Sequence, residues 1–349
     1  MKPFSLVQNP RFGELREILK ENPGWLTPWS GHFFRFQTIR FPSAGNILSG
    51  LGAKARSGRW NPPGLAAVYG SSTDSAALEE SKANDRYYGV ETKAPRILVT
   101  IHADVRGMLD LRSPVLRRRL GVTLDELNAE DWRRMVDQNR ESLTQAMGRA
   151  AASMGASGIL AHSAAVHRAH NVILFPPLRD AGVLRIVGDE DLLRLRSPRK
   201  SWVMHYCSVS CMRMSTRQSP KKSAKASLPA LSFRFRHRGA RDYAELLRTY
   251  RSIFEVTQIQ LVRLTGFSPR SVAKWAQGET PSPKQEKALV EMDRLFDGLA
   301  RVMDPAQVGR WLTQPNPAFD GSTPLQVVER GELDRIWRML YDLESGQPG

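Results

Sequence analysis

The sequence predicts an α+β domain followed by an all-helical domain, and three observations carry this prediction. Up to about residue 195, short runs rich in β-branched and aromatic residues alternate with a few helical segments. From about residue 240 the pattern becomes helical throughout. Between the two, residues 201–240 hold eight Lys or Arg and no Asp or Glu, which is typical of a disordered basic linker. A chain of 349 residues is long enough for two or three domains.

The first region reads as a compact mixed sheet with helices. Its clearest strand is PRILVTIH, which is rich in β-branched residues and ends at His102. Residues 124–152 carry apolar side chains near helical spacing and predict a helix. Strands are expected at residues 32–36, 65–69, 95–102, 158–162 and 172–175.

The second region reads as a set of helices with clear boundaries. Gly266 ends one of them, and Ser268 with Pro269 opens the next as its N-cap and first-turn proline. A Pro-rich bend precedes a final pair of short helices. The other helices are expected over residues 241–254, 258–264 and 284–303.

The segment QIQLVRLTGFSPRSVAKWAQ has the shape of a helix-turn-helix. Its second helix carries Arg270, Ser271 and Lys274 on polar positions, while Val272 and Trp275 fit a packed side. Such a helix can enter the major groove of DNA, and the net charge of +16 is compatible with a nucleic-acid partner. The alternative is a helical hairpin that only packs.

The composition is that of a cytoplasmic protein without a metal site. No apolar run is long enough to span a membrane, and the N-terminus lacks the apolar core of a signal peptide. Cys207 and Cys211, beside His205, are too few for a disulfide framework or a zinc site.

Residues 56–80, RSGRWNPPGLAAVYGSSTDSAALEE, contain the strongest chemical signal. Arg59 lies in a loop rich in Gly and Pro, Tyr69 ends a strand-like run, and a helix start delivers Glu79 and Glu80. An arginine can bind a diphosphate bidentately, and a carboxylate can stabilise an oxocarbenium-like carbon. This set suits the breaking of a charged glycosidic bond; the alternative is a surface turn with ordinary charges.

Residues 30–180 resemble the RES-domain toxins, which are named for arginine, glutamate and serine. The matching pieces are FFRF with Arg35, SGRWNPPG with Arg59, VYGSS with Tyr69, ALEES with Glu80, and GILAHSAAVHRAHNVILF with Ser163. Residues 240–349 resemble antitoxins of the Xre/MbcA/ParS type. The helix-turn-helix matches this family, and so does GRWLTQPNPAFDGSTPLQVVERGELDRIWRML, which is similar to its toxin-binding domain.

The resemblance implies an ADP-ribosyltransferase-like fold and NAD as the substrate, without a metal. It implies that Arg35 and Arg59 hold the diphosphate and that Tyr69 lines the nicotinamide-ribose pocket. Glu80, preferred over Glu79, would stabilise the ribosyl cation or orient the acceptor, and Ser163 would hydrogen-bond in the cleft. Together Glu80, Ser163 and Arg59 would be the catalytic residues.

The resemblance further implies a type II toxin–antitoxin module in one chain. We expect a toxin domain over residues 1–195, a linker over 196–240, a helix-turn-helix domain over 241–303 and a toxin-binding domain over 304–349. The toxin half would cleave the nicotinamide–ribose bond by hydrolysis or phosphorolysis. The antitoxin half, in cis or from a second chain of a homo-oligomer, would inhibit it and bind promoter DNA.

Two alternatives to this function stay open on the sequence alone. The first is an ADP-ribosyltransferase that acts on a host protein. The second is a DNA-binding autoregulator whose enzyme half is inactive. Transfer of ADP-ribose to a host protein differs from hydrolysis and phosphorolysis of NAD only in the acceptor. One pocket would therefore serve all three reactions.

Overall fold

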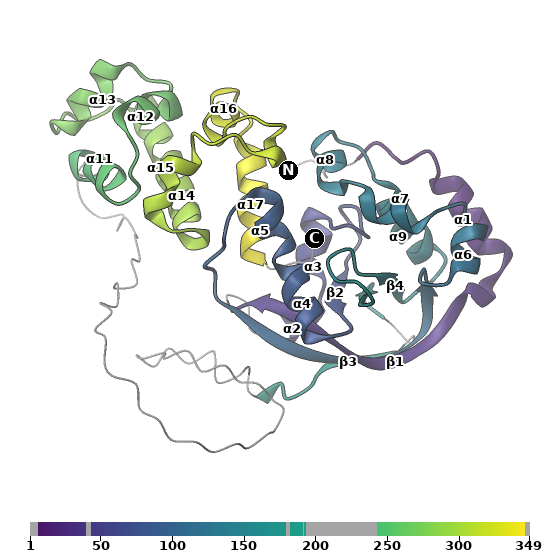
Figure 1. Ribbon diagram of the computed structural model, residues 1–349. Helices are drawn as coiled ribbons and strands as arrows, with labels where there is room; N and C mark the ends of the chain where they lie inside the picture. Colours follow the sequence, from purple (N-terminus) through teal and green to yellow (C-terminus); the bar gives the residue numbers. More distant parts are fainter. Residues whose placement is uncertain (1–5, 40–42, 179–181, 191, 193–242, 346–349) are drawn as a thin grey trace. The chain divides into compact units, whose positions relative to one another are not determined.

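The computed structural model describes residues 6–39, 43–178, 182–190, 192 and 243–345. Within these ranges the N-terminal region is a mixed sheet with helices and the C-terminal region is helical (Figure 1). The fold class predicted from the sequence is therefore confirmed. The predicted linker, with Cys207 and Cys211, lies outside the described residues. No helix in the described part of the chain is long and apolar enough to cross a membrane.

The N-terminal sheet has six strands in the order β1-β2-β5-β4-β3-β6, and β1 also pairs with β3. This additional pairing joins the first five strands of that order into a closed circuit. β3 pairs with β4 in parallel, and every other pairing is antiparallel. The strands are β1 (Leu26–Thr38), β2 (Val68–Ser71), β3 (Arg96–Asp110), β4 (Gly158–His162), β5 (His170–Leu174) and β6 (Gly182–Ile186).

Two strands are much longer than the sequence indicates. β1 and β3 pair with each other from Leu26 opposite Leu109 to Thr38 opposite Arg96. This cross-chain pairing extends both strands beyond their β-branched centres, which a local pattern cannot show. β2 begins at Val68 instead of residue 65, and β6 was not predicted.

The N-terminal helices are short, and most begin at a side-chain cap. Residues 124–152 form three helices where one was predicted, because Thr123, Asp131 and Ser142 each accept a hydrogen bond from the first turn that follows them. The helices are α1 (Phe12–Glu21), α2 (Ala44–Leu48), α3 (Leu51–Arg56), α4 (Asp74–Ser81), α5 (Ala83–Tyr88), α6 (Pro114–Arg119), α7 (Leu124–Ala129), α8 (Trp132–Asp137) and α9 (Leu143–Ser153).

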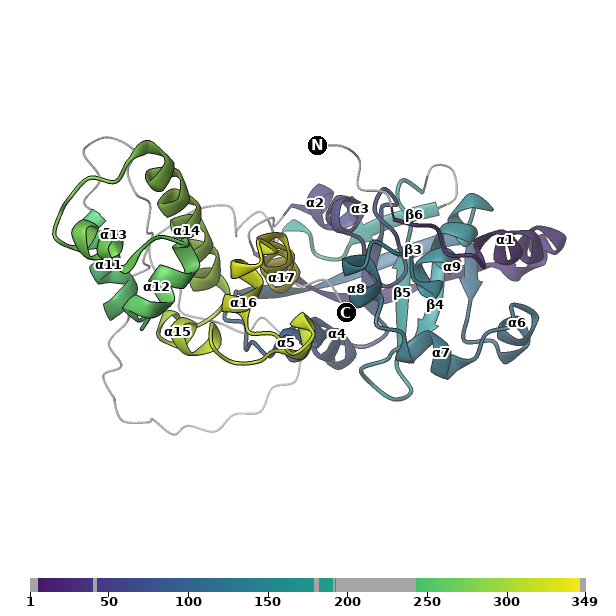
Figure 2. The same ribbon diagram turned by 90° about the horizontal axis from the view of Figure 1, so that it is seen from above.

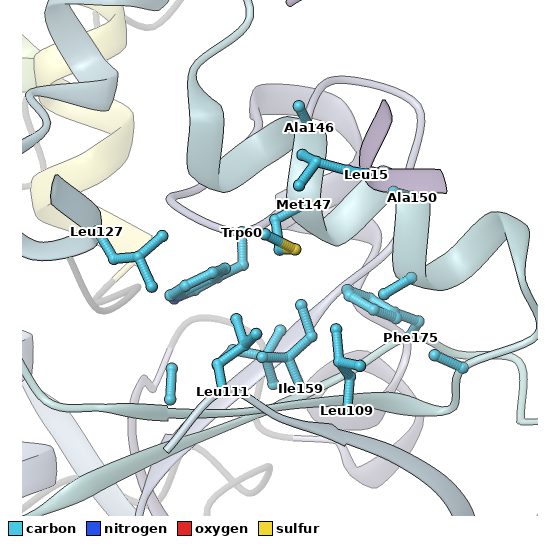
Figure 3. Close-up of a cluster of buried hydrophobic side chains, with 14 of the residues drawn as sticks. Leu15, Trp60, Leu109, Leu111, Leu127, Ala146, Met147, Ala150, Ile159 and Phe175 are labelled. Carbon is cyan, nitrogen blue, oxygen red and sulfur yellow. The ribbon is translucent and has the colours of Figure 1, made fainter. Parts of the chain in front are cut away.

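Two buried hydrophobic clusters stabilise the sheet and its helices. One joins α1 and α9 to the sheet through residues such as Leu15, Met147 and Ile159, with Trp60 inserted from the loop before β2 (Figure 3). The other is built around Phe33 and Ile101. All the buried residues of both clusters precede residue 193, so the N-terminal region has cores of its own.

The loop that carries Arg59 lies directly against α9. A Cβ atom at Gly148 would lie 1.7 Å from the carbonyl oxygen of Trp60, so only glycine permits this approach. The side chain of Gln145, also on α9, donates a hydrogen bond of 3.0 Å to the carbonyl of Gly58. The loop that holds the candidate site residue Arg59 is thus fixed by a helix in the core.

The long α14 packs against α12 and α17, while α13 and α16 pack against α12; Figure 2 shows α12 beside α14. Tyr250 of α11 stacks on Phe296 of α14 with ring centroids 4.5 Å apart. The helices are α11 (Tyr243–Ser252), α12 (Gln258–Thr265), α13 (Pro269–Ala276), α14 (Pro283–Val302), α15 (Val308–Trp311), α16 (Pro324–Glu329) and α17 (Leu333–Ser345).

Two helices joined by a short turn, α12 and α13, form where the sequence predicts a helix-turn-helix. Gly266 caps α12 in the left-handed conformation, and the Ser268 side chain caps α13. Val272 and Trp275 are buried, which matches the predicted packed side of α13.

Candidate active site

Helix α4 turns one of two adjacent glutamates into the protein and the other outward. Thr73 caps the helix by accepting a hydrogen bond from the backbone of Ala76. Glu80 is only 1% exposed, on the same helix face as the buried Ala76 and Ala77. Glu79 points outward, with 41% of its side chain accessible, and pairs with Arg86 at 2.9 Å. Of the two candidates, the structure therefore buries Glu80 among the other predicted site residues.

One oxygen of the Glu80 carboxylate is held by two donors. Ser163 Oγ donates to Glu80 Oε1 at 2.6 Å, and Asn171 Nδ2 donates to the same oxygen at 2.7 Å. Ser71, opposite Asn171 in the β2–β5 ladder, donates to Asn171 Oδ1 at 2.8 Å and so fixes the direction of the amide. No described residue donates to Oε2. The carboxylate is thus oriented with one oxygen available to a ligand.

The hydroxyl of Ser163 is fully engaged in this arrangement. It donates to Glu80 and accepts from the backbone N–H groups of Ala165 at 3.1 Å and Val166 at 3.0 Å. A hydroxyl that donates to one partner and accepts from two has no capacity left for a substrate. Ser163 is therefore placed to position Glu80.

Arg35 and Tyr69 lie on neighbouring strands and contact each other. Arg35, on β1, donates to Gln37 Oε1 at 2.9 Å and to the backbone carbonyl of Tyr69 at 3.1 Å. Burial lowers the pKa of Arg35 to about 10, so the guanidinium stays charged at neutral pH.

The Tyr69 hydroxyl braces the loop that carries Arg59. It donates to Asn61 Oδ1 at 2.7 Å and accepts from the backbone of Trp60 at 2.9 Å. Burial raises the pKa of Tyr69, which keeps the hydroxyl protonated as a donor. Its predicted role at the nicotinamide ribose stays a prediction.

Arg59 reaches from its loop to the end of α7. Its Nη1 donates to the backbone carbonyl of Leu127 at 3.0 Å and lies 3.4 Å from that of Glu130. Its Nε is buried without a hydrogen-bond partner in the structure. Burial lowers the pKa of Arg59, the nearby Arg133 lowers it further, and Glu80 acts in the opposite direction.

Two further groups of the site were not predicted from the sequence. Asn171, which holds Glu80, directly precedes the apolar run VILF, and a polar residue at the end of a predicted strand was the available signal. Arg133 lies on α8 and is 8% exposed. The sequence gives no signal for its burial, because local spacing does not show what covers a helix face.

The C-terminal helix α17 contacts α5, next to the helix that carries Glu80. Tyr88 donates to the Asp342 carboxylate at 2.7 Å, and Asn84 donates to the Asp342 backbone carbonyl at 3.1 Å. Arg96 donates to the carbonyl of Leu343 at 2.8 Å. Burial, followed by the Asp342 carboxylate, raises the pKa of Tyr88 well above its usual value, so this hydroxyl remains a donor.

Other contacts between the two regions surround this one. Lys93 pairs with Asp304 at 2.7 Å, and Asn316 donates to the Tyr88 carbonyl at 2.7 Å. The Arg56 guanidinium lies 5.0 Å from the centre of the Tyr341 ring. The contacts are polar as well as aromatic.

The three predicted DNA-contacting residues share one helix. Arg270 and Lys274 are exposed on α13, and Lys274 pairs with Glu279 at 2.8 Å. Ser271 is half-buried, with its hydroxyl 3.0 Å from that of the N-cap Ser268. In the part of the chain that the structure describes, no cluster of His, Cys, Asp and Glu could hold a metal ion.

The fold and the site define a class: an α+β domain with a buried, oriented glutamate, joined to a helical domain that contacts it. A family model described as the RES domain matches residues 33–195. A second, described as the antitoxin Xre/MbcA/ParS C-terminal toxin-binding domain, matches residues 292–346. The predicted domain boundaries themselves stay predictions.

Comparison with known proteins gives two kinds of relative. The mycobacterial cidal antitoxin MbcA of Mycobacterium tuberculosis is 31% identical over 80 residues, which are 23% of this chain and 71% of MbcA. The NAD(+) phosphorylase MbcT of the same organism is 32% identical over 126 residues, 34% of this chain and 62% of MbcT. This chain thus spans about three fifths of the length of MbcT.

The chain belongs to the family of the antitoxin MbcA, and it joins that antitoxin domain to a RES domain in one polypeptide. Among solved structures, the crystal structure of the M. tuberculosis MbcT–MbcA toxin–antitoxin complex aligns with a TM-score of 0.37 at 21% identity. That alignment covers 52% of this chain and 96% of the other.

Proposed function

We propose that the RES domain cleaves the nicotinamide–ribose bond of NAD and that the antitoxin domain of the same chain inhibits it. The carrying observation is the Glu80 carboxylate, which is held through Oε1 while Oε2 stays available. A buried, pre-oriented negative charge is the group that stabilises an oxocarbenium-like ribose carbon best. Arg59 and Arg35 are proposed to hold the diphosphate.

The proposed reaction needs no acid catalyst and no metal. The bond between ribose C1′ and the positively charged nicotinamide nitrogen breaks, and both electrons stay with nicotinamide, which leaves neutral. An oxygen of the acceptor then bonds to C1′. We propose that Glu80 stabilises the cationic carbon and that Ser163 and Asn171 keep the carboxylate in place.

The proposed acceptor is inorganic phosphate, because the relative MbcT is a phosphorylase. The products would then be nicotinamide and a phosphorylated ADP-ribose. Hydrolysis would give ADP-ribose instead, and transfer to a host protein would give a modified protein.

The identity of the products tests this proposal directly. Residues 1–196, which have their own hydrophobic clusters, are incubated with NAD, with and without phosphate and with cell extract. We expect rapid NAD loss only with phosphate, with the phosphorylated sugar seen by mass spectrometry. Equal loss without phosphate would identify a hydrolase, a mass gain on an extract protein would identify a transferase, and no NAD loss in any mixture would reject the enzyme.

Inhibition by the antitoxin domain is supported by the contacts of α17. This helix binds Asn84, Tyr88 and Arg96, which all follow α4, the helix of the proposed catalytic glutamate, in the sequence. The same contacts suit the antitoxin domain of the same chain or of a second copy, and a homo-oligomer stays a prediction.

A second proposed activity is DNA binding by the helix-turn-helix. The exposed Arg270 and Lys274 on α13, opposite the buried Val272 and Trp275, favour it. Such a helix can present basic side chains to a major groove while its other face packs.

Changing both Arg270 and Lys274 to Ala is expected to weaken binding of the full chain to its own promoter DNA by at least tenfold. The slope of affinity against salt should also become shallower, because fewer counterions are released from DNA. Fluorescence anisotropy at several salt concentrations measures both quantities. The matched control changes Arg118 and Arg119, an exposed basic pair at the end of α6, to Ala. Equal loss in the control would indicate general electrostatic attraction without a role for α13.

A further inference from the structure

Two arginines of the N-terminal region flank the segment between α7 and α8. Arg59 donates to the carbonyls of Leu127 and Glu130, and Arg133 follows three residues later, as the second residue of α8. The Nε atoms of both arginines are buried without a hydrogen-bond partner. A buried N–H group without a partner costs free energy, so this arrangement is incomplete without an acceptor.

The two guanidinium groups also repel each other. Arg133 contributes to lowering the pKa of Arg59, second only to burial. The Glu80 and Glu130 carboxylates act in the opposite sense, but among the described residues neither of them hydrogen-bonds to Arg59 or Arg133. Glu130 accepts from the backbone N–H groups of Leu143 and Thr144, and Glu80 accepts from Ser163 and Asn171. Two like charges, Arg133 buried and Arg59 half-buried, with no described carboxylate hydrogen-bonded to either, form a site for an anion.

The Arg133 side chain is held in place for such a ligand. Its guanidinium lies 4.8 Å from the centre of the Tyr87 ring and 4.6 Å from that of Trp132. One Nη atom donates to the side chain of Asn84. A guanidinium held by stacking and one hydrogen bond loses little further freedom when it binds an anion.

The C-terminal helix approaches this arginine through Asn84. Asn84, which accepts from Arg133, also donates to the backbone carbonyl of Asp342. The Asp342 carboxylate accepts a hydrogen bond from Tyr88. Burial raises the pKa of Asp342, and the nearby positive charges of Arg133, Arg338 and Arg56 lower it. The positive charge of Arg133 thus acts on the Asp342 carboxyl as well as on Arg59.

We infer that Arg59 and Arg133 together form a subsite for a phosphate group, and that Asp342 of α17 competes with phosphate for Arg133. Planar guanidinium groups bind phosphate oxygens through paired hydrogen bonds, which matches the unpartnered donors. The identity of the phosphate rests on the proposed function: it belongs either to the diphosphate of NAD or to inorganic phosphate as the acceptor.

Binding to the full chain tests the subsite without any catalysis. Isothermal titration at physiological salt measures the affinities for pyrophosphate and inorganic phosphate. Arg133→Gln is expected to weaken the tighter of the two by roughly ten- to a hundredfold. Arg133→Lys, which keeps the charge without the planar fork, should lose less. The matched control is Arg118→Gln, an exposed arginine of α6, which should leave the affinity unchanged.

The competition is tested by a double-mutant cycle. Asp342→Ala should tighten phosphate binding in the full chain by about tenfold, because the competing carboxylate is removed. In the Arg133→Gln background the same change should have little effect. Affinities that do not differ between the wild-type chain and Arg133→Gln would overturn the subsite. An equal effect of Asp342→Ala in both backgrounds would overturn the competition.

Kinetics of residues 1–196 then distinguish the source of the phosphate. A higher KM for NAD in Arg133→Gln would assign the subsite to the diphosphate, and a higher KM for phosphate would assign it to the acceptor. If NAD is cleaved with both KM values unchanged, the subsite fails while the proposed function stands. If phosphate binding depends on Arg133 but NAD is never cleaved, the proposed function fails while the subsite stands.

Discussion

Replacing Glu80 by Gln in residues 1–196 is expected to lower the rate of NAD consumption by about two to three orders of magnitude. Gln has nearly the same size, and its amide oxygen can still accept from Ser163 and Asn171. The change therefore removes the negative charge opposite the developing cation and little else. NAD loss followed by chromatography, with circular dichroism to confirm folding, measures the effect.

The neighbouring glutamate supplies the matched control. Glu79→Gln changes the same residue type one position earlier, where the side chain is exposed and pairs with Arg86 and Lys82. Surface ion pairs of this kind contribute little to stability, so both activity and folding should be retained. Normal turnover in the Glu80 variant together with a loss in the Glu79 variant would reverse the assignment.

Residues 1–196 expressed alone are expected to deplete NAD and arrest growth, whereas the full chain should do so far less. The N-terminal region has its own buried clusters, so it should fold without the antitoxin domain. In the full chain, α17 occupies Tyr88, Asn84 and Arg96. A covalent tether raises the local concentration of the inhibiting domain to roughly the millimolar range, so even a weak interface stays mostly closed.

Growth after induction and the cellular NAD level measure this difference. A graded control is Tyr88→Phe in the full chain, which removes one hydrogen bond to Asp342 and keeps the ring beside Phe319. Its activity should lie between those of the full chain and residues 1–196. Equal NAD depletion by the full chain and the isolated N-terminal region would show that the C-terminal half does not inhibit.

Much of the architecture could be predicted because its signals are local. Gly266, Ser268 and Pro269 determine where α12 ends and α13 begins, since capping and backbone conformation depend on a few adjacent residues. The same local caps at Asp131 and Ser142 were overlooked, and this is why one helix was predicted over residues 124–152 where three are found.

Part of the candidate site was equally accessible from the sequence. Arg59, Tyr69 and Glu80 lie within 22 consecutive residues, and their types suit one reaction. The preference for Glu80 over Glu79 agrees with helical spacing from the buried Ala76 and Ala77. The engagement of the Tyr69 hydroxyl with Asn61 and Trp60 was not foreseen, because it depends on how the loop folds back.

The sequence by itself thus determined the order of the two domains, the helix boundaries set by caps, and the residue types of the reaction. Only the tertiary structure decided how these residues act together. Asn171 holds Glu80 from 91 residues away, and Asn84 meets α17 across 258 residues. Such contacts arise from strand pairing and domain packing, which fix directions and burial that no local pattern contains. Arg133 became a candidate ligand residue for this reason: the folded chain buries its charge beside Arg59.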